Sequence, residues 1–174
     1  NKKGTMKVTG FAYKASSVSP LTKEVSEILF RQVGTGAEEK EVTDAIRDIS
    51  TSVLSGEWGI ESLAPYGRIG KETYKNTPPL SVRAARYYNE HMDPIDPVRV
   101  GDSIRWLYVS ESPDNLPYTE VAAFRNPIEL EGFSVDYGLI VDKFIKAKIK
   151  RVYDTLGWKS LDKACGAKMP KSHW

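Results

Sequence analysis

Apolar side chains recur every three to four residues in four segments of the chain, and this is the spacing of amphipathic helices. In the first segment, residues 20–33, Leu21 and Val25 share one face, and Ser19 can cap the free amides at the helix start. The same spacing predicts three further helices, over residues 37–54, 79–91 and 137–156. Glycines follow the first, second and fourth segments, where they suit helix ends.

Shorter segments have the pattern of strands. Residues 6–13 alternate weakly between apolar and polar, and residues 104–109 and 120–124 are predicted to be two strands joined by a turn at 112–117. Residues 57–78 contain several glycines and prolines and are predicted to be irregular. The sequence therefore predicts an α+β fold that is mostly helical, with a small two-stranded β insert late in the chain.

These elements divide the chain into five expected parts. They are an N-terminal strand at 1–14, a helical core at 15–92, an acidic β insert at 93–136, a C-terminal helix at 137–158 and a basic tail at 159–174. We expect the tail to be poorly ordered.

The charges of the 174-residue chain are strongly segregated, although its formal net charge is only +2. Residues 68–89 hold five basic residues against Glu72, and residues 143–171 hold nine against two acids. Residues 90–136 hold ten acids against three arginines. A protein can bind a polyanion despite a net charge near zero if one of its faces is basic. Two alternatives remain open: solvated charges on ordinary helices, or an interaction module whose acidic insert binds a basic partner.

The sequence offers little for catalysis. It has neither a glycine-rich phosphate-binding motif nor an H-E-x-x-H zinc motif, so we expect no catalytic residue, metal or cofactor in this chain. A small hydrolase or transferase would have to use His91 with Asp93 or Asp96, but the prolines beside both acids suit a turn better. The single Cys165 and the lack of a long apolar run lead us to expect a cytoplasmic protein without membrane contact.

Four segments, taken together and in order, resemble the thumb subdomain of family-B DNA polymerases from archaea and T-even-like bacteriophages. Residues 6–17 resemble the last strand of the palm as it enters the thumb. Residues 69–89, with a lysine-bearing loop, a proline and an arginine-bearing helix, resemble the central thumb element. Residues 100–109 and 136–158 resemble the Gly-Asp strand and the last long helix, which ends in Leu-Gly.

The resemblance implies a thumb that grips the primer–template duplex behind the active site, largely across the minor groove. It also implies a partner, the remaining polymerase portion with palm, fingers and exonuclease, in which the complete enzyme would use Mg²⁺. The aspartate signature of the palm does not occur in this sequence, so synthesis is not expected of this chain alone. Residues 165–174 lack the short apolar–aromatic motif with which family members dock on the sliding clamp, so clamp binding is not expected either.

Basic and hydrogen-bonding side chains at the strand-to-helix junction, in the glycine-rich loop and on the following helix can contact phosphates. The expected DNA-binding residues are Lys14, Ser16, Ser17, Arg68, Lys71, Lys75, Asn76, Thr77, Arg83 and Arg86. A second set lies on the C-terminal helix, where solvent exposure alone also explains it: Lys143, Lys146 and Lys150.

Overall fold

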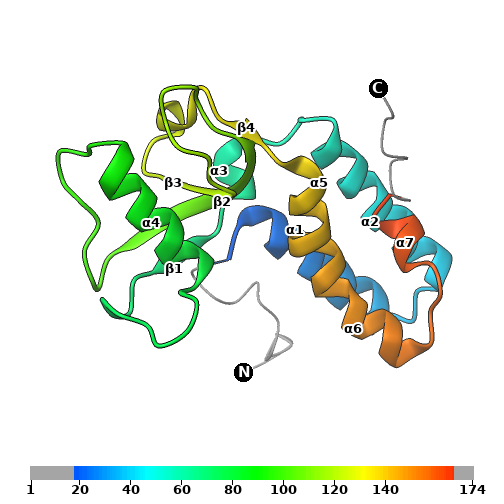
Figure 1. Ribbon diagram of the computed structural model, residues 1–174. Helices are drawn as coiled ribbons and strands as arrows, with labels where there is room; N and C mark the ends of the chain where they lie inside the picture. The colour runs from blue at the N-terminus through cyan, green and yellow to red at the C-terminus, as the bar shows by residue number, and fades with distance from the viewer. Residues whose placement is uncertain (1–17, 167–174) are drawn as a thin grey trace.

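The computed structural model describes residues 18–166, which form an α+β fold dominated by helices, as predicted (Figure 1). In chain order the elements are α1 (Pro20–Ile28), η2 (Leu29–Val33), α2 (Glu39–Leu54), α3 (Ile60–Leu63), β1 (Tyr66–Arg68), α4 (Leu80–His91), β2 (Ser103–Glu111), β3 (Val121–Phe124), η3 (Pro127–Leu130), β4 (Ser134–Val135), α5 (Tyr137–Ile140), η4 (Val141–Lys146), α6 (Ala147–Leu156) and α7 (Leu161–Ala164). We call α1, η2, α2, α5, η4, α6 and α7 the helical half, and the remaining elements the sheet half. Figure 1 shows the sheet half on the left and the helical half on the right.

The predicted start of the first helix is confirmed. The Ser19 side chain accepts a hydrogen bond from the backbone N–H of Thr22 at 3.2 Å, and Pro20 occupies the first turn. The chain then continues through η2, a π-helical stretch, and leaves the helix at Gly34. The second helix, α2, begins with a capping box in which Glu38 and Glu41 each accept a bond from the other's backbone.

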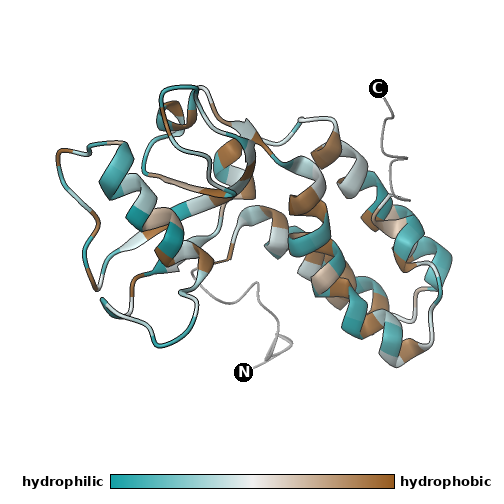
Figure 2. Ribbon diagram, viewed as in Figure 1, coloured by the Kyte–Doolittle hydropathy of each residue, from teal (hydrophilic) through white to brown (hydrophobic). Residues whose placement is uncertain are grey.

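The long C-terminal helix is also confirmed, as the continuous run of α5, η4 and α6. It ends at Gly157, whose φ of +70° is the left-handed conformation that glycine adopts without strain. Ile145, Ile149 and Tyr153 on this run are fully buried, and the Tyr153 hydroxyl is 2.6 Å from that of Thr43 on α2. Figure 2 shows hydrophobic and hydrophilic residues alternating around the long helices, as expected for amphipathic helices.

The sheet has four antiparallel strands, so the prediction of a two-stranded insert is incomplete. The central strand, β2, pairs with β3 through Trp106 opposite Ala123, and with β1 through Ile104 opposite Gly67. The short β4 also pairs with β2, at Val109 opposite Val135. The first strand and α3 both come from residues 57–78, so the prediction that this whole segment is irregular is wrong.

The third predicted helix, α4, packs against β3 with Val82, Ala85 and Tyr88 buried. These three residues belong to a hydrophobic cluster that extends through both halves of the molecule. The loop that leads into α4 is thereby held against the sheet, and it carries four of the ten expected DNA-binding residues, Lys71, Lys75, Asn76 and Thr77.

The segment after residue 158 differs from the expectation of poor order. Residues 161–164 form α7, which packs on α2, and Ala164 and Cys165 are buried. The rest of the expected tail, residues 167–174, lies outside the described residues, as do the expected N-terminal strand and the candidates Lys14, Ser16 and Ser17. Among residues 18–166, no helix combines the length and the apolar character that crossing a membrane requires.

Candidate nucleic-acid interface

The loop between β1 and α4, residues 69–79, arranges two cations around one aromatic ring. The ammonium of Lys71 lies 4.9 Å from the centroid of the Tyr74 ring, and the guanidinium of Arg86 lies 5.9 Å from it. A cation over a ring face at such distances is held by the ring quadrupole, which contributes about 0.5–1 kcal/mol at an exposed site. The half-buried Tyr74 therefore fixes two positive charges that are separated in the sequence by most of the loop and the first half of α4.

The loop is tied to α4 and to the turn just before β2. The guanidinium of Arg86 donates a hydrogen bond to the backbone carbonyl of Glu72 at 2.7 Å. Ile69 donates to the carbonyl of Asp102 at 2.8 Å, and Gly101 donates back to the carbonyl of Ile69 at 2.7 Å. These bonds anchor the beginning of the loop, so its cations project from a fixed backbone.

The other expected residues of the loop, and Arg68 at the end of β1, are exposed to solvent. Arg68, Lys75, Asn76 and Thr77 are all exposed, which is the placement that contact with a phosphate backbone requires. The structure thus brings Lys71 and Arg86 together, with the remaining candidates on the same loop or at its start. The acid of this segment, Glu72, is exposed as well.

Arg83 is engaged elsewhere. Its guanidinium forms an ion pair with the carboxylate of Glu120 at 2.9 Å, and its Nε is buried without a hydrogen-bond partner. This pair links α4 to the residue just before β3. Arg83 is therefore a structural contact of the sheet half as much as a candidate for DNA binding.

The second set of lysines lies in the helical half, on η4 and α6. Lys146 pairs with Asp162 of α7 at 2.9 Å, and this hydrogen bond raises the pKa of Lys146. Lys150 pairs with Asp154, one helical turn further on, at 2.6 Å. Lys143 is exposed. Two of these three lysines thus already have carboxylate partners within the chain.

Many acids of the segment 90–136 bond within the segment or to α4. Glu129 accepts hydrogen bonds from the Tyr88 hydroxyl at 2.6 Å and from the backbone of Arg125 and Asn126. Burial raises the pKa of Glu129, but these hydrogen bonds outweigh it and hold the pKa below its ordinary value. The partners of three further acids are, in the same way, Arg99 for Asp96, Ser134 for Glu111 and Arg83 for Glu120. The acidic insert is therefore held together by its own carboxylates.

The residues considered for catalysis are not assembled into a site. His91 pairs with its neighbour Glu90 at 3.4 Å and packs against the ring of Tyr87, while Asp96 is paired with Arg99. Burial raises the pKa of Cys165 to about 12, so its thiol is protonated at neutral pH. Within residues 18–166, no cluster of His, Cys, Asp and Glu side chains could hold a metal ion.

Sequence reasoning missed Tyr74, the ring between the two cations, and Asn89, which fastens the loop after α4. The signal for Tyr74 was present, because a tyrosine between Lys71 and Lys75 in a glycine- and proline-rich loop is an aromatic among cations. Asn89 left no such signal, because its partner is a backbone segment brought near only by folding.

No known protein family matches the chain, and no curated protein matches it either.

Proposed function

We propose that this chain is the thumb portion of a family-B DNA polymerase and that it grips duplex DNA without sequence preference. The observation that carries the proposal is the pair of cations, Lys71 and Arg86, fixed around Tyr74 on a loop anchored to α4. These residues lie inside residues 69–89, one of the four segments that resemble the thumb, so sequence pattern and side-chain placement support the same interface.

The proposed interface binds through charge. Lys71, Lys75 and Arg86 contact phosphate oxygens, and Asn76 and Thr77 add neutral hydrogen-bond donors beside them. Phosphate contacts position a duplex but carry no base information, and the minor groove offers only a degenerate pattern. Such a grip suits a protein that must hold every sequence that passes through it.

The catalytic step belongs to the partner in this proposal. The palm of the remaining polymerase portion would supply the carboxylates and the Mg²⁺ that they hold, while this chain keeps the duplex from dissociating between additions. The internal partners of Glu111 and Glu120 favour this reading over the alternative of an acidic face that captures a basic protein, because both carboxylates already have partners.

The test is fluorescence anisotropy with a labelled primer–template duplex, a duplex of scrambled sequence and a single strand. We expect equal affinity for both duplexes, weaker binding of the single strand, and a clear loss for Lys71→Ala. The matched control is Lys148→Ala, which removes an exposed lysine from α6 and should leave the affinity near that of the parent. Equal losses in the two variants would overturn the proposed interface, because they would indicate a response to net charge alone.

A further inference from the structure

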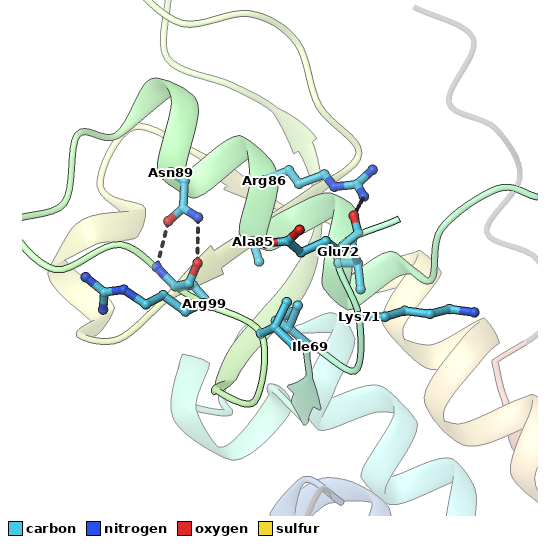
Figure 3. A pocket seen from close by; sticks show the side chains of 10 residues that line it. Ile69, Lys71, Glu72, Ala85, Arg86, Asn89 and Arg99 are labelled. Carbon is cyan, nitrogen blue, oxygen red and sulfur yellow. Dashed lines mark hydrogen bonds between the residues drawn. The ribbon is translucent and has the colours of Figure 1, made fainter. Parts of the chain in front are cut away.

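A hollow of about 420 Å³ lies beside the proposed interface, between α4 and the two loops that flank it (Figure 3). Its apolar lining consists of Ile69, Val82, Ala85, Val98 and Val100. Val100 is 47% exposed, which leaves an apolar wall open to solvent. Small-molecule pockets typically span about 300–1,000 Å³, and a hollow within this range has room for one large side chain.

Hydrogen bonds from α4 hold both walls of the hollow in place. The side chain of Asn89 donates to the carbonyl of Val98 at 2.9 Å and accepts from its N–H at 2.8 Å. One turn earlier, Arg86 donates to the carbonyl of Glu72 on the opposite wall. Figure 3 shows both sets of bonds. A site that is already formed in this way does not pay the ordering cost of a mobile loop when it binds.

Three cations and one acid surround the apolar floor. In Figure 3 the side chains of Lys71, Arg86 and Arg99 point outward from the hollow, while the carboxylate of Glu72 points towards Ala85. Arg99 is paired with Asp96, but both side chains are more than half exposed, and a surface pair of this kind is weak enough to exchange partners. The hollow thus combines an apolar centre with a predominantly positive rim.

We propose that this hollow docks an acidic protein segment, in which one apolar side chain enters the hollow and flanking carboxylates contact Lys71, Arg86 and Arg99. The excess of positive charge on the rim selects the carboxylates, and the valines and isoleucine select the apolar side chain. Before docking, the carboxylate of Glu72 occupies the opening, and it swings away when the segment binds.

A nucleobase fits the hollow less well than a side chain does. Unpaired bases bind proteins by stacking on aromatic side chains, and the lining of the hollow contains no aromatic ring. The amide of Asn89, which could otherwise read a base edge, already uses one of its two N–H donors and its oxygen on Val98. The floor therefore has the chemistry of a protein core and not that of a base pocket.

The site shares Lys71 and Arg86 with the proposed DNA interface. An acidic segment bound in the hollow would therefore compete with duplex DNA, and this one consequence rests on the proposed function. Docking itself does not depend on DNA binding, so the experiment is done without DNA.

The probe is a fluorescein-labelled, N-acetylated peptide with one phenylalanine between two glutamates on each side, titrated with the whole chain. The reference peptides replace the phenylalanine by serine, or the glutamates by lysines. We expect saturable binding of the first peptide, at least about fivefold weaker binding of the serine peptide, and no binding of the lysine peptide. Equal binding of the phenylalanine and serine peptides would overturn the proposal.

Variants of the hollow give a second test, because two of them should weaken peptide binding and one should strengthen it. Lys71→Glu reverses a charge on the rim and Val100→Asp places an acid in the apolar wall, so each should weaken binding of the acidic peptide by about threefold to tenfold. Glu72→Gln should strengthen binding, because it removes the acid at the opening. The control Lys148→Glu makes the same charge change on α6 and should have little effect, and circular dichroism checks that each variant is folded. Weaker binding by Glu72→Gln would contradict the proposal, because the hollow would then select a cation.

Sedimentation velocity of the chain alone tests whether a second copy of the chain occupies the hollow instead. The loop at residues 93–97 carries a fully exposed Ile95 between Asp93 and Asp96, so a second copy offers a segment of the same chemistry. The proposed occupant belongs to another protein, so the proposal predicts a monomer at all concentrations measured, with Asp96 still paired to Arg99 of its own chain. Concentration-dependent dimers that Ile95→Ser abolishes would overturn it in favour of self-association.

Discussion

Gly67 marks the closest approach between β1 and α4. A Cβ built at this position would lie 2.0 Å from the Cβ of Ser81 and 2.6 Å from its hydroxyl oxygen, distances that no relaxed side chains adopt. The φ angle of Gly67 is ordinary, so the position requires glycine for space and not for backbone conformation. The loop that carries Lys71 and Tyr74 starts two residues later, and its position depends on this contact.

We expect Gly67→Ala to destabilise the protein by about 1–3 kcal/mol, because overpacking forces β1 and α4 apart. Urea unfolding followed by circular dichroism measures the effect. The double variant Gly67→Ala/Ser81→Gly removes the clashing atoms and should recover stability to the level of Ser81→Gly alone. An unchanged unfolding midpoint for Gly67→Ala would contradict the tight contact.

The ion pair between Arg83 and Glu120 gives a test that separates DNA binding from the acidic-face alternative. Glu120→Gln frees the Arg83 guanidinium and removes a negative charge near α4, so we expect duplex affinity to rise by about twofold to threefold, as for one weak surface charge contact. Glu111→Gln removes a charge whose partner is Ser134, not an arginine, and serves as the control. Weaker DNA binding in Glu120→Gln would contradict the placement of the duplex near this helix.

At the scale of elements, Glu39 fastens α7 to α2. Its carboxylate accepts hydrogen bonds from the backbone N–H groups of Lys159 and Ser160, each at 2.9 Å, and from the Ser160 hydroxyl. The hydrogen bond from the Ser160 side chain is the main cause that lowers the pKa of Glu39 below its ordinary value of 4.5. The lowered pKa means that the ionised carboxylate is the form that stabilises the docked segment.

The resulting pH dependence has a definite sign. The stabilisation by Glu39 is fully present above its ordinary pKa of 4.5 and is lost as the pH falls through the lower pKa of the folded state. We expect the amide resonances of Lys159 and Ser160 to titrate with a midpoint below 4.5 in NMR spectra. Glu39→Gln should abolish that titration, and a midpoint at or above 4.5 in the parent would contradict the contact.

The burial of Cys165, which directly follows α7, is measurable by thiol chemistry. A pKa of about 12 in place of 9.0 reduces the thiolate fraction at pH 8 by about a thousandfold, and Cys165 is only 7% exposed. We expect its reaction with Ellman's reagent to be at least about a thousandfold slower in the native protein than in urea. Because the sequence contains one cysteine, the signal has one source. A native rate within tenfold of the denatured rate would contradict the burial of the thiol.

The elements that could be predicted from the sequence are the long helices, such as α2 and the run from α5 to α6, where apolar residues repeat over several turns. The elements that it missed are short. β1, β4, α3 and α7 span two to four residues each and are stabilised by strand pairing or docking, which leave no periodic signal. In the same way, the basic character of residues 68–86 was predictable, but the pairing of Arg83 with Glu120 was not, since it depends on tertiary packing.

At the scale of the whole molecule, acidic and basic side chains have different roles. Carboxylates of the acidic insert bond to groups of the sheet half and stabilise it, whereas the exposed cations of residues 68–77 project from an anchored loop. A near-neutral chain can in this way present one basic surface without destabilising itself by long-range repulsion. The proposed grip on duplex DNA depends on that surface and not on the net charge.

The salt dependence of duplex binding tests this central claim most directly. If about four phosphates are neutralised, the logarithm of the association constant should fall against the logarithm of salt concentration with a slope of about −3 to −4. Lys71→Ala should reduce the magnitude of the slope by about 1, since it removes one phosphate contact, and Lys148→Ala should leave the slope unchanged. A slope near zero, or the same slope in the parent and in Lys71→Ala, would contradict the claim that this loop holds the DNA.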